Sequence, residues 1–522
     1  MADRVLDRVR QPLALADAWM NRLYGWRYNP LYHTGVVAAA LLAAVMVTGV
    51  YLLFFYRIGS PYDSVARITN TIWLGPWTRS FHRYASDAAL VATLIHLVRM
   101  WLQRRTWGSR ALAWYSGLVL LFLILVCGWT GYVMVWDVQA EVLAREGARW
   151  MDALPLFSEP IERAFDGERE LPAAFFFLNL FAHVALPVGL GVVFWIHVAR
   201  VARPVLVPPK PLLWGMLGLL GIASLLLPIT MGPAAQAFRL PGTAPYDVFY
   251  SFFLPLTRPA APWLVWAGLL GLTGILVLVP TLLRPPLARR PAASVVDERS
   301  CTGCEQCWLD CPYEAIDMVE RTDDRPYLVA RVDPGLCTSC GICAGSCAPM
   351  GVGPPGRTGK AQLDAIARFC TTHLAQPGEI VIVACGRGSG GISASLDFED
   401  APVFPVQCAG NLHTSTVEYL VRSGAGGVLI VTCPPRDCWN REGPLWLEQR
   451  LYHQREAELK ARVDQRRVRL ISAGEREQAV VHDALAEFRA EVRALGSAER
   501  EESPAIDLEC DVPEPEAAEA HQ

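Results

Sequence analysis

Histidines in two apolar stretches of the sequence are spaced so that they could bind two metal-centred cofactors. His82 and His96 lie 14 residues apart, and so do His183 and His197. On an α-helix 14 residues turn through ~1400° and rise ~21 Å, so each helix would carry two imidazoles on one face, one near each membrane surface. Two such helices side by side predict two bis-histidine sites, His82 with His183 outside and His96 with His197 inside. Two stacked haems need this arrangement.

Glycines repeat the same spacing in two neighbouring apolar stretches. Gly35 and Gly49 are 14 residues apart, as are Gly117 and Gly131. Because glycine has no side chain, a flat porphyrin could lie against these helices at matching depths. One glycine pair alone more often serves helix packing, and one membrane histidine alone is often a satisfied core residue. The coincidence of four spacings favours haem binding.

Cysteines are concentrated in the second half of the chain, where 13 of the 15 lie between residues 301 and 438. The segments "CTGCEQCWLDCP" and "CTSCGICAGSCAP" share the run Cys-x-x-Cys-x-x-Cys-x-x-x-Cys, which is the pattern of bacterial two-cluster ferredoxins, where the fourth cysteine binds the other cluster. Zinc is the alternative, because thiolates bind it too, but the doubled pattern favours clusters. The predicted [4Fe–4S] ligand sets are Cys301, Cys304, Cys307 and Cys347, and Cys337, Cys340, Cys343 and Cys311.

A third group of cysteines follows short β-type runs beyond residue 379. "EIVIVAC", "APVFPVQC" and "GGVLIVTC" end at Cys385, Cys408 and Cys433, and Cys438 follows five residues later. Since the carboxyl ends of parallel strands meet at one edge of a sheet, these four thiolates could converge on a [2Fe–2S] cluster, with Cys370 as a reserve ligand. The alternative for each cysteine is a small buried hydrophobic residue.

Long apolar runs dominate the first half of the 522-residue chain. Each of the six runs is long enough for a membrane-spanning helix. They are Val36 to Tyr56, Ala85 to Trp101, Leu112 to Trp136, Phe175 to Val201, Leu212 to Met231 and Pro262 to Leu283. The predicted fold is therefore multidomain: an all-α transmembrane helical bundle of six spans, an α+β module like bacterial ferredoxins, and an α/β domain.

The composition shifts along the chain predict seven segments. They are an amphipathic surface segment (1–28), a four-helix di-haem bundle (29–211), two further transmembrane helices (212–283), a linker rich in proline and arginine (284–297), the two-cluster module (298–352), the α/β iron–sulfur domain (360–498) and an acidic tail expected to be disordered (499–522).

The charges in the loops predict the orientation. Arginines flank alternate ends of the spans, and the opposite side carries an acidic loop from Asp137 to Glu170. By the positive-inside rule both termini are cytoplasmic, in a multi-pass protein of the inner (cytoplasmic) membrane. That reducing compartment favours metal binding over disulfides. The net charge of -4 gives no indication of nucleic-acid binding.

The histidine pattern and its surroundings resemble cytochrome b of the quinol-oxidising bc-type complexes. The resemblance rests on the four histidines, on "HVALP", on "GYVMVW" at Gly131, and on Arg79 and Arg99, each three residues from a histidine. It implies two b-type haems in a four-helix bundle, with Arg79 and Arg99 near the haem propionates. The alternative for both arginines is interfacial anchoring.

One segment departs from that family. Its members carry Pro-Glu-Trp-Tyr in the quinol-oxidising pocket, whereas "APYDVFYSFF" has Tyr246 and Asp247 at the comparable place. Asp247 could replace the missing acid, but we favour its interpretation as a solvated loop aspartate. The segment therefore argues against quinol oxidation on the outer side.

The last domain resembles the delta (iron–sulfur) subunit of methyl-viologen-reducing hydrogenase, in "VQCAGNLH", "GAGGVLIVTCPPRDC" and the run ending at Cys385. The resemblance implies a [2Fe–2S] cluster and a cytoplasmic flavoprotein partner of the heterodisulfide-reductase type.

Together these patterns predict a membrane-bound electron-transfer subunit of a respiratory-type oxidoreductase. It would link the quinone or quinol pool to a cytoplasmic redox partner through two haems b, two [4Fe–4S] clusters and one [2Fe–2S] cluster. We expect it to be part of a complex, with a dimer left open, and we assign no residue an acid–base catalytic role. The alternatives are a transmembrane electron wire without a quinone site and a redox-sensing membrane anchor.

Overall fold

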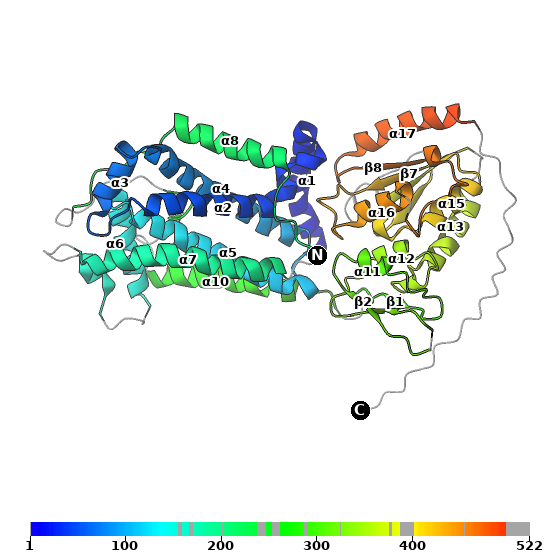
Figure 1. Ribbon diagram of the computed structural model, residues 1–522, viewed down its shortest axis with the longest axis horizontal. Helices are drawn as coiled ribbons and strands as arrows, with labels where there is room; N and C mark the ends of the chain where they lie inside the picture. Colours follow the sequence, from blue (N-terminus) through cyan, green and yellow to red (C-terminus); the bar gives the residue numbers. More distant parts are fainter. Residues whose placement is uncertain are drawn as a thin grey trace.

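The computed structural model describes residues 2–154, 159–165, 171–199, 203–236, 247–252, 262–286, 290–323, 325–374, 378–386, 401–453 and 455–496. It has a helical half, which contains the apolar runs, and a mixed half, which contains the cysteine-rich segments (Figure 1). Tyr246 and the predicted acidic tail, 499–522, lie outside the described residues.

Four long helices form the centre of the helical half. Helix α2 (Thr34–Leu53) packs against α4 (Gly75–Leu102), and α5 (Ala111–Val133) packs against α7 (Ala173–Ala199). These two pairs also touch through α4 and α5. The pairing brings both glycine-bearing helices against the two histidine-bearing helices.

By length and composition, five helices of the described residues can cross a membrane. They comprise the four central helices and α10 (Pro262–Leu282). The predicted span from Leu212 to Met231 instead forms α8 (Lys210–Leu226), which has 17 residues. Helix α8 ends at this point because Pro228 disfavours the helical conformation of Leu227, whose φ and ψ are -126° and 64°. The sequence therefore predicted six spans, whereas the described residues contain five helices that are long and apolar enough to cross a membrane.

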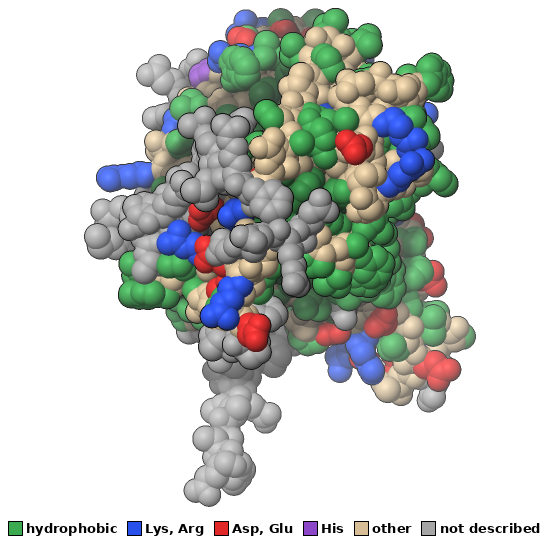
Figure 2. Space-filling view, turned by 90° about the vertical axis from the view of Figure 1, so that its left-hand side faces the viewer, with side chains coloured by type: hydrophobic (Ala, Val, Ile, Leu, Met, Phe, Trp, Pro, Cys, Tyr) green, Lys and Arg blue, Asp and Glu red, His purple; other side chains and the backbone are tan. Residues whose placement is uncertain are grey.

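Shorter helices cover the two ends of this half. At one end lie α3 (Pro61–Asn70), α6 (Val138–Asp152) and the 3₁₀ turn η3 (Ile161–Phe165). Figure 2 looks onto this end, where basic and acidic side chains are interspersed with hydrophobic ones. At the other end, α1 (Ala2–Tyr28), which bends at Gly25 (φ 69°), runs across the long helices, next to the mixed half (Figure 1). The turns η1 (Pro30–His33) and η2 (Gly108–Arg110) precede α2 and α5.

The first part of the mixed half is built from two small antiparallel sheets. Strand β1 (Val295–Val296) pairs with β4 (Val352–Gly353), and β2 (Ile316–Val319) pairs with β3 (Val329–Val332). Each cysteine run contains one short helix, α11 (Gln306–Leu309) or α12 (Ile342–Ser346). Six of the eight cysteines in these two runs belong to one buried cluster of side chains, so the fold gathers them in its core.

The second part is a parallel sheet of four strands in the order β6-β5-β7-β8. The strands are β5 (Ile380–Cys385), β6 (Val403–Val406), β7 (Gly427–Thr432) and β8 (Val468–Ser472). Helices α13 (Gly359–His373), α15 (Thr414–Arg422), α16 (Gly443–Tyr452) and α17 (Gln478–Ala494), with turns η5 (Ala409–Asn411) and η6 (Gln465–Arg467), surround the sheet. Every residue of β5 and β7 is buried, because the sheet has a hydrophobic core on each face.

Candidate metal centres

The outer pair of predicted histidines meets between α4 and α7. The ring centroids of His82 and His183 are 6.4 Å apart, and the ring planes are inclined by 56°. Since a metal–imidazole nitrogen bond is ~2 Å long, one metal atom can lie between the two rings with a bond to each. The residues present therefore fit an iron held by both imidazoles.

The inner pair of histidines shares a large cavity. His96 and His197 both line a space of about 620 Å³ between the four central helices. Gly35 and Gly117, the glycines predicted at this depth, are in the same lining. A cavity of this volume is in the range of cofactor pockets and is lined mainly by apolar side chains. The cavity therefore fits a haem, which His96 and His197 would hold.

Each predicted glycine lies against one predicted histidine. A Cβ atom built on the glycine would stand 3.0 Å from Cε1 of His96 at Gly35, 3.2 Å from Cε1 of His82 at Gly49, 3.4 Å from Cε1 of His197 at Gly117 and 2.9 Å from Cε1 of His183 at Gly131. The glycines therefore leave space for the imidazole rings themselves.

A hydroxyl group accompanies every one of these glycines, a feature that the sequence analysis missed. The residue before each glycine contacts Nδ1 of the same histidine: Thr34 and His96 at 3.5 Å, Thr48 and His82 at 3.1 Å, Ser116 and His197 at 3.0 Å, and Thr130 and His183 at 3.1 Å. The dipeptide Thr-Gly or Ser-Gly at 14-residue spacing was the available signal in the sequence.

The hydroxyls determine which imidazole nitrogen is free. The hydroxyls of Thr48, Ser116 and Thr130 donate to backbone carbonyls one turn back, at 2.8, 2.9 and 2.9 Å. Each oxygen can then accept a hydrogen bond from the Nδ1–H of its histidine. This contact leaves the lone pair of Nε2 available for a metal and holds the ring in place.

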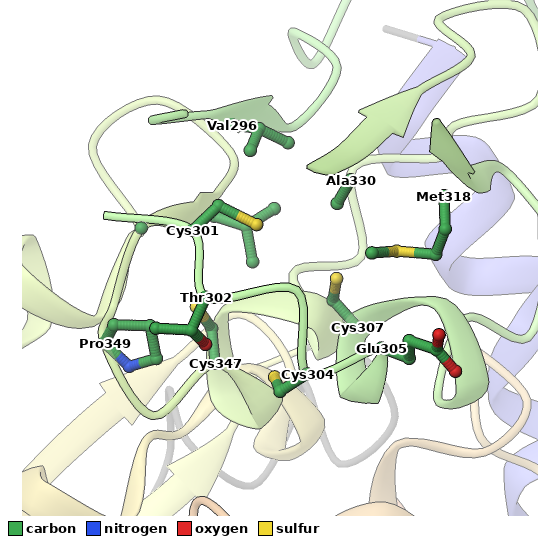
Figure 3. A pocket seen from close by; sticks show the side chains of 12 residues that line it. Val296, Cys301, Thr302, Cys304, Glu305, Cys307, Met318, Ala330, Cys347 and Pro349 are labelled. Atoms are coloured by element: carbon green, nitrogen blue, oxygen red, sulfur yellow. The ribbon is translucent and has the colours of Figure 1, made fainter. Parts of the chain in front are cut away.

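The two cysteine sets predicted to bind [4Fe–4S] clusters line two separate cavities. Cys301, Cys304, Cys307 and Cys347 line one of them, together with Val296, Met318 and Ala330 (Figure 3). The other is lined by Cys311, Cys337, Cys340 and Cys343. The geometry thus groups the eight side chains in the two crossed sets predicted from the sequence, with the fourth cysteine of each run in the other set.

The surroundings of these sulfurs suit cluster ligands. Burial raises the pKa of the Cys307 and Cys340 thiols and raises that of Cys343 to about 12, so a cation has to stabilise the thiolates. Backbone N–H groups of Ala315 and Ser339 donate to the sulfurs of Cys311 and Cys337 at 3.3 and 3.4 Å. Among the described residues, no three His, Cys, Asp or Glu side chains are close enough to share a single ion; each cysteine of a four-iron cluster binds a different iron.

The third cysteine set converges at the carboxyl edge of the parallel sheet. Hydrogen bonds join the thiols of Cys408 and Cys433 to Cys438, and that of Cys433 also to Cys385. The bonds from its two neighbours lower the pKa of Cys438, which favours its thiolate. The reserve candidate, Cys370, packs in the core on α13 and bonds to Ser423 instead.

Three segments of the chain match known protein families. Residues 22–203 match cytochrome b/b6/petB, residues 300–351 match the 4Fe-4S dicluster domain, and residues 395–496 match the delta subunit of methyl-viologen-reducing hydrogenase. The chain is a fusion of these three domains. The resemblances stated from the sequence are thereby confirmed, and a cytochrome b domain joined to iron–sulfur domains makes the chain a membrane electron-transfer subunit.

Relatives of the cytochrome b domain include respiratory proteins. The menaquinol:cytochrome c reductase cytochrome b subunit of Bacillus subtilis (strain 168) is 23% identical over 217 residues, which are 38% of this chain and 97% of that protein. Cytochrome b of Sulfolobus acidocaldarius is 30% identical over 134 residues, 26% of this chain and 24% of that one. A solved structure titled hyperthermophilic respiratory Complex III has a TM-score of 0.40 and 17% identity, over 50% of this chain and 78% of that chain.

The two predicted propionate arginines of the cytochrome b domain have other partners. Arg99 is 3% exposed, and its two amino groups donate to Asp17 at 2.8 and 3.0 Å and to Asp437 at 2.6 Å. Arg79 donates to the carbonyl of Ile229 at 2.9 Å. The Arg99 guanidinium therefore joins the cytochrome b domain to the delta-subunit domain and is not in the lining of the inner cavity.

Asp247 differs from the interpretation favoured above. Its side chain is buried and accepts hydrogen bonds from Arg83 at 2.8 Å, from the backbone N–H groups of Phe249 and Tyr250 at 2.8 Å each, and from the Tyr132 hydroxyl. The interpretation as a solvated aspartate is wrong, because α4 and α5 bring Arg83 and Tyr132 over this segment. The carboxylate forms part of the packing at the outer end of the bundle.

One aromatic side chain of the dicluster domain lies between the inner histidine cavity and the cavity of the second cysteine set. Tyr313, two residues after Cys311, lines both the inner cavity and the cavity of the second cysteine set. Leu336, which precedes Cys337, also lines the inner cavity. No sequence signal marked this position, since the contact joins residues more than 100 apart in the chain.

Proposed function

We propose that this subunit passes electrons between the quinone or quinol pool and a cytoplasmic redox partner through two haems b, two [4Fe–4S] clusters and one [2Fe–2S] cluster. The observation that carries the proposal is the position of Tyr313 in the walls of both the inner histidine cavity and the second cysteine cavity. Two redox centres held there would be separated by one layer of side chains.

The chain's own residues hold and orient the carriers. His82 with His183, and His96 with His197, would hold the haem irons, and the hydroxyls before the four glycines would fix the orientation of their rings. The three cysteine sets described above are the proposed cluster ligands. Haem iron and iron–sulfur clusters supply one-electron carriers when bound. The protein contributes spacing, hydrogen bonds to the ligands and exclusion of water.

The quinone link and the partner rest on the relatives. Two similar proteins, from Bacillus subtilis and Geobacillus thermodenitrificans, are described as menaquinol:cytochrome c reductase cytochrome b subunits, which supports a quinone or quinol as the membrane-side reactant. The match to a hydrogenase delta subunit supports a cytoplasmic flavoprotein of the heterodisulfide-reductase type as the other reactant. In this arrangement α8 is the sixth span, and both termini lie in the cytoplasm at the inner membrane.

A second candidate function is a transmembrane electron wire without a quinone site. The buried state of Asp247 favours it, because Arg83, Tyr132 and two backbone N–H groups already occupy that carboxylate.

The test uses purified membranes that contain the full chain. The protein is reduced chemically, the b-haem and iron–sulfur spectra are recorded, and a soluble quinone analogue is added. We expect rapid reoxidation of both haems, and its loss in His96→Ala and His197→Ala variants. Haems that stay reduced until an external acceptor protein is added would refute the quinone link and leave the wire.

The contact at Tyr313 is tested in the same experiment. Tyr313→Leu removes the aromatic ring, whereas Tyr313→Phe keeps it and serves as the matched control. We expect slower reoxidation of the clusters in Tyr313→Leu, with unchanged haem reoxidation, and near-normal rates in Tyr313→Phe. Equal cluster rates in all three proteins would show that electrons do not pass at this position.

A further inference from the structure

Among the described residues, three arginines at the end of the inner cavity next to the dicluster domain have no carboxylate within ion-pair distance. Arg105, Arg110 and Arg441 all line the cavity that contains His96 and His197. Within the described part of the chain, none of the three forms an ion pair, and Glu314, the carboxylate in the lining, does not pair with them.

Their recorded partners are almost all backbone oxygens. Arg105 donates to the carbonyls of Asp437 and Cys438 at 3.1 and 2.6 Å, Arg110 to the carbonyl of Trp439 at 3.2 Å and to the Tyr313 hydroxyl, and Arg441 to the carbonyls of Pro312 and Arg203 at 2.7 and 3.0 Å. Nε of Arg105 is buried without a partner among the described residues. The three side chains thus keep a net positive charge beside the cavity.

Partial burial makes an unpaired charge costly at this end of the cavity. Arg105, Arg110 and Arg441 are each partly shielded from solvent. A buried cation is stable only when an anion or a full set of hydrogen bonds compensates for its lost hydration. Guanidinium groups bind carboxylates in a two-pronged geometry, so a ligand with carboxylates at this end of the cavity would supply the compensation.

We propose that Arg105, Arg110 and Arg441 hold the two propionate carboxylates of the inner haem. The inference rests on the proposed function, in which His96 and His197 bind that haem. Arg99, the residue expected from the sequence, already shares its amino groups between Asp17 and Asp437. The carboxylates are therefore bound by the loop after α4, which carries Arg105 and Arg110, and by the delta-subunit domain, which carries Arg441.

The arrangement makes the delta-subunit domain a wall of the haem pocket. Arg441 lies three residues after Cys438, and the ion pair of Arg99 with Asp437 holds this segment on the cytochrome b domain. The charge of Arg441 then acts on the inner haem only while the two domains are docked. Haem potential and domain docking are coupled through this one segment.

The experiment is a redox titration of the full-length protein in detergent, with Arg441→Gln as the test variant. Arg203→Gln is the matched control, since this neighbouring arginine pairs with Glu442 at 3.6 Å and is not in the cavity lining. A His96→Ala variant identifies the signals of the inner haem. We expect Arg441→Gln to disfavour reduction of the inner haem about tenfold, ~59 mV for a one-electron couple, and Arg203→Gln to leave it unchanged.

Infrared redox-difference spectra of protein that contains isotope-labelled haem propionates give a second readout. Loss of the guanidinium raises the propionate pKa, so a protonated carboxyl band should appear in Arg441→Gln at a pH where the parent protein has none. An unchanged potential and spectrum in Arg441→Gln, with both altered in Arg99→Gln, would overturn the proposal in favour of Arg99. A parent protein that binds no haem at the inner site would instead refute the proposed function.

Discussion

Replacing Gly131 by alanine should weaken the outer haem site selectively, and Gly117 offers the matched comparison. A Cβ at Gly131 would lie 2.9 Å from Cε1 of His183, whereas one at Gly117 would lie 3.4 Å from Cε1 of His197. The second distance is an ordinary contact, but the first requires the imidazole to move by about half an ångström. Crowding of this kind costs ~1–3 kcal/mol, which corresponds to a roughly 5- to 150-fold loss of haem affinity.

Apart from the contact with the histidine, the two substitutions are expected to have the same effects on the helix. Both residues lie in α5, and both substitutions raise helix propensity by ~1 kcal/mol. The difference between the variants therefore reports the contact with the histidine alone. Haem content is measured by pyridine haemochrome analysis of the purified proteins, and the two haems are distinguished by their low-spin resonance signals.

We expect Gly131→Ala to lose the outer haem on dilution or mild detergent treatment, while Gly117→Ala keeps two haems. Equal retention of both haems in the two variants would refute the reasoning, because it would show that the imidazole rings do not depend on the space above these glycines. Loss of the inner haem from Gly117→Ala would refute it as well.

Three further predictions concern the mixed half and its junction with the helical half. Cys311→Ser should abolish the cluster signal of the second cysteine set and spare the first, as measured by electron paramagnetic resonance and iron content; loss of the first signal instead would refute the crossed pairing. Burial raises the pKa of Asp17 from 3.8 to about 6, so the folded state favours the protonated carboxyl. The stabilisation that this group contributes should be fully present below pH ~4 and be lost as the pH rises through ~6. Asp17→Asn should remove that decline in thermal melting curves, and a decline that persists would contradict the assignment. Arg450 is 1% exposed and donates to the Ser346 hydroxyl at 2.9 Å and to the Gly410 carbonyl at 2.8 Å, so Arg450→Gln should destabilise the mixed half by ~1–3 kcal/mol through loss of these buried hydrogen bonds; an unchanged urea midpoint would argue against this.

Local spacing made a large part of the candidate site predictable. The 14-residue intervals between histidines and between glycines reflect the geometry of one helix, and the cysteine runs reflect one loop and turn each. The three resemblances were confirmed for the same reason, since short contiguous motifs carry them. The hydroxyl residue that precedes each glycine is an equally local sequence signal, and its 14-residue repeat could have been recognised from the sequence.

Other features were beyond the sequence because they join residues far apart in the chain. Arg99 and Asp437 are separated by 338 positions and Arg83 and Asp247 by 164. A sequence pattern cannot indicate that a carboxylate so distant will satisfy a guanidinium, so Arg99 looked free for a propionate and Asp247 looked solvated. The end of α8 is different, because a local residue, Pro228, marks it. The predicted span ran past Pro228 because the following residues are mostly apolar.

The sequence by itself determined which side chains can bind iron and at what depth or turn each one lies, because helix pitch and turn geometry act over a few residues. Only the tertiary structure decided which charges are paired, which side chain lies between the inner histidine cavity and the second cysteine cavity, and that Arg441 of the last domain lines a cavity of the first. These outcomes depend on how the three domains pack, and packing is a property of surfaces assembled from the whole chain.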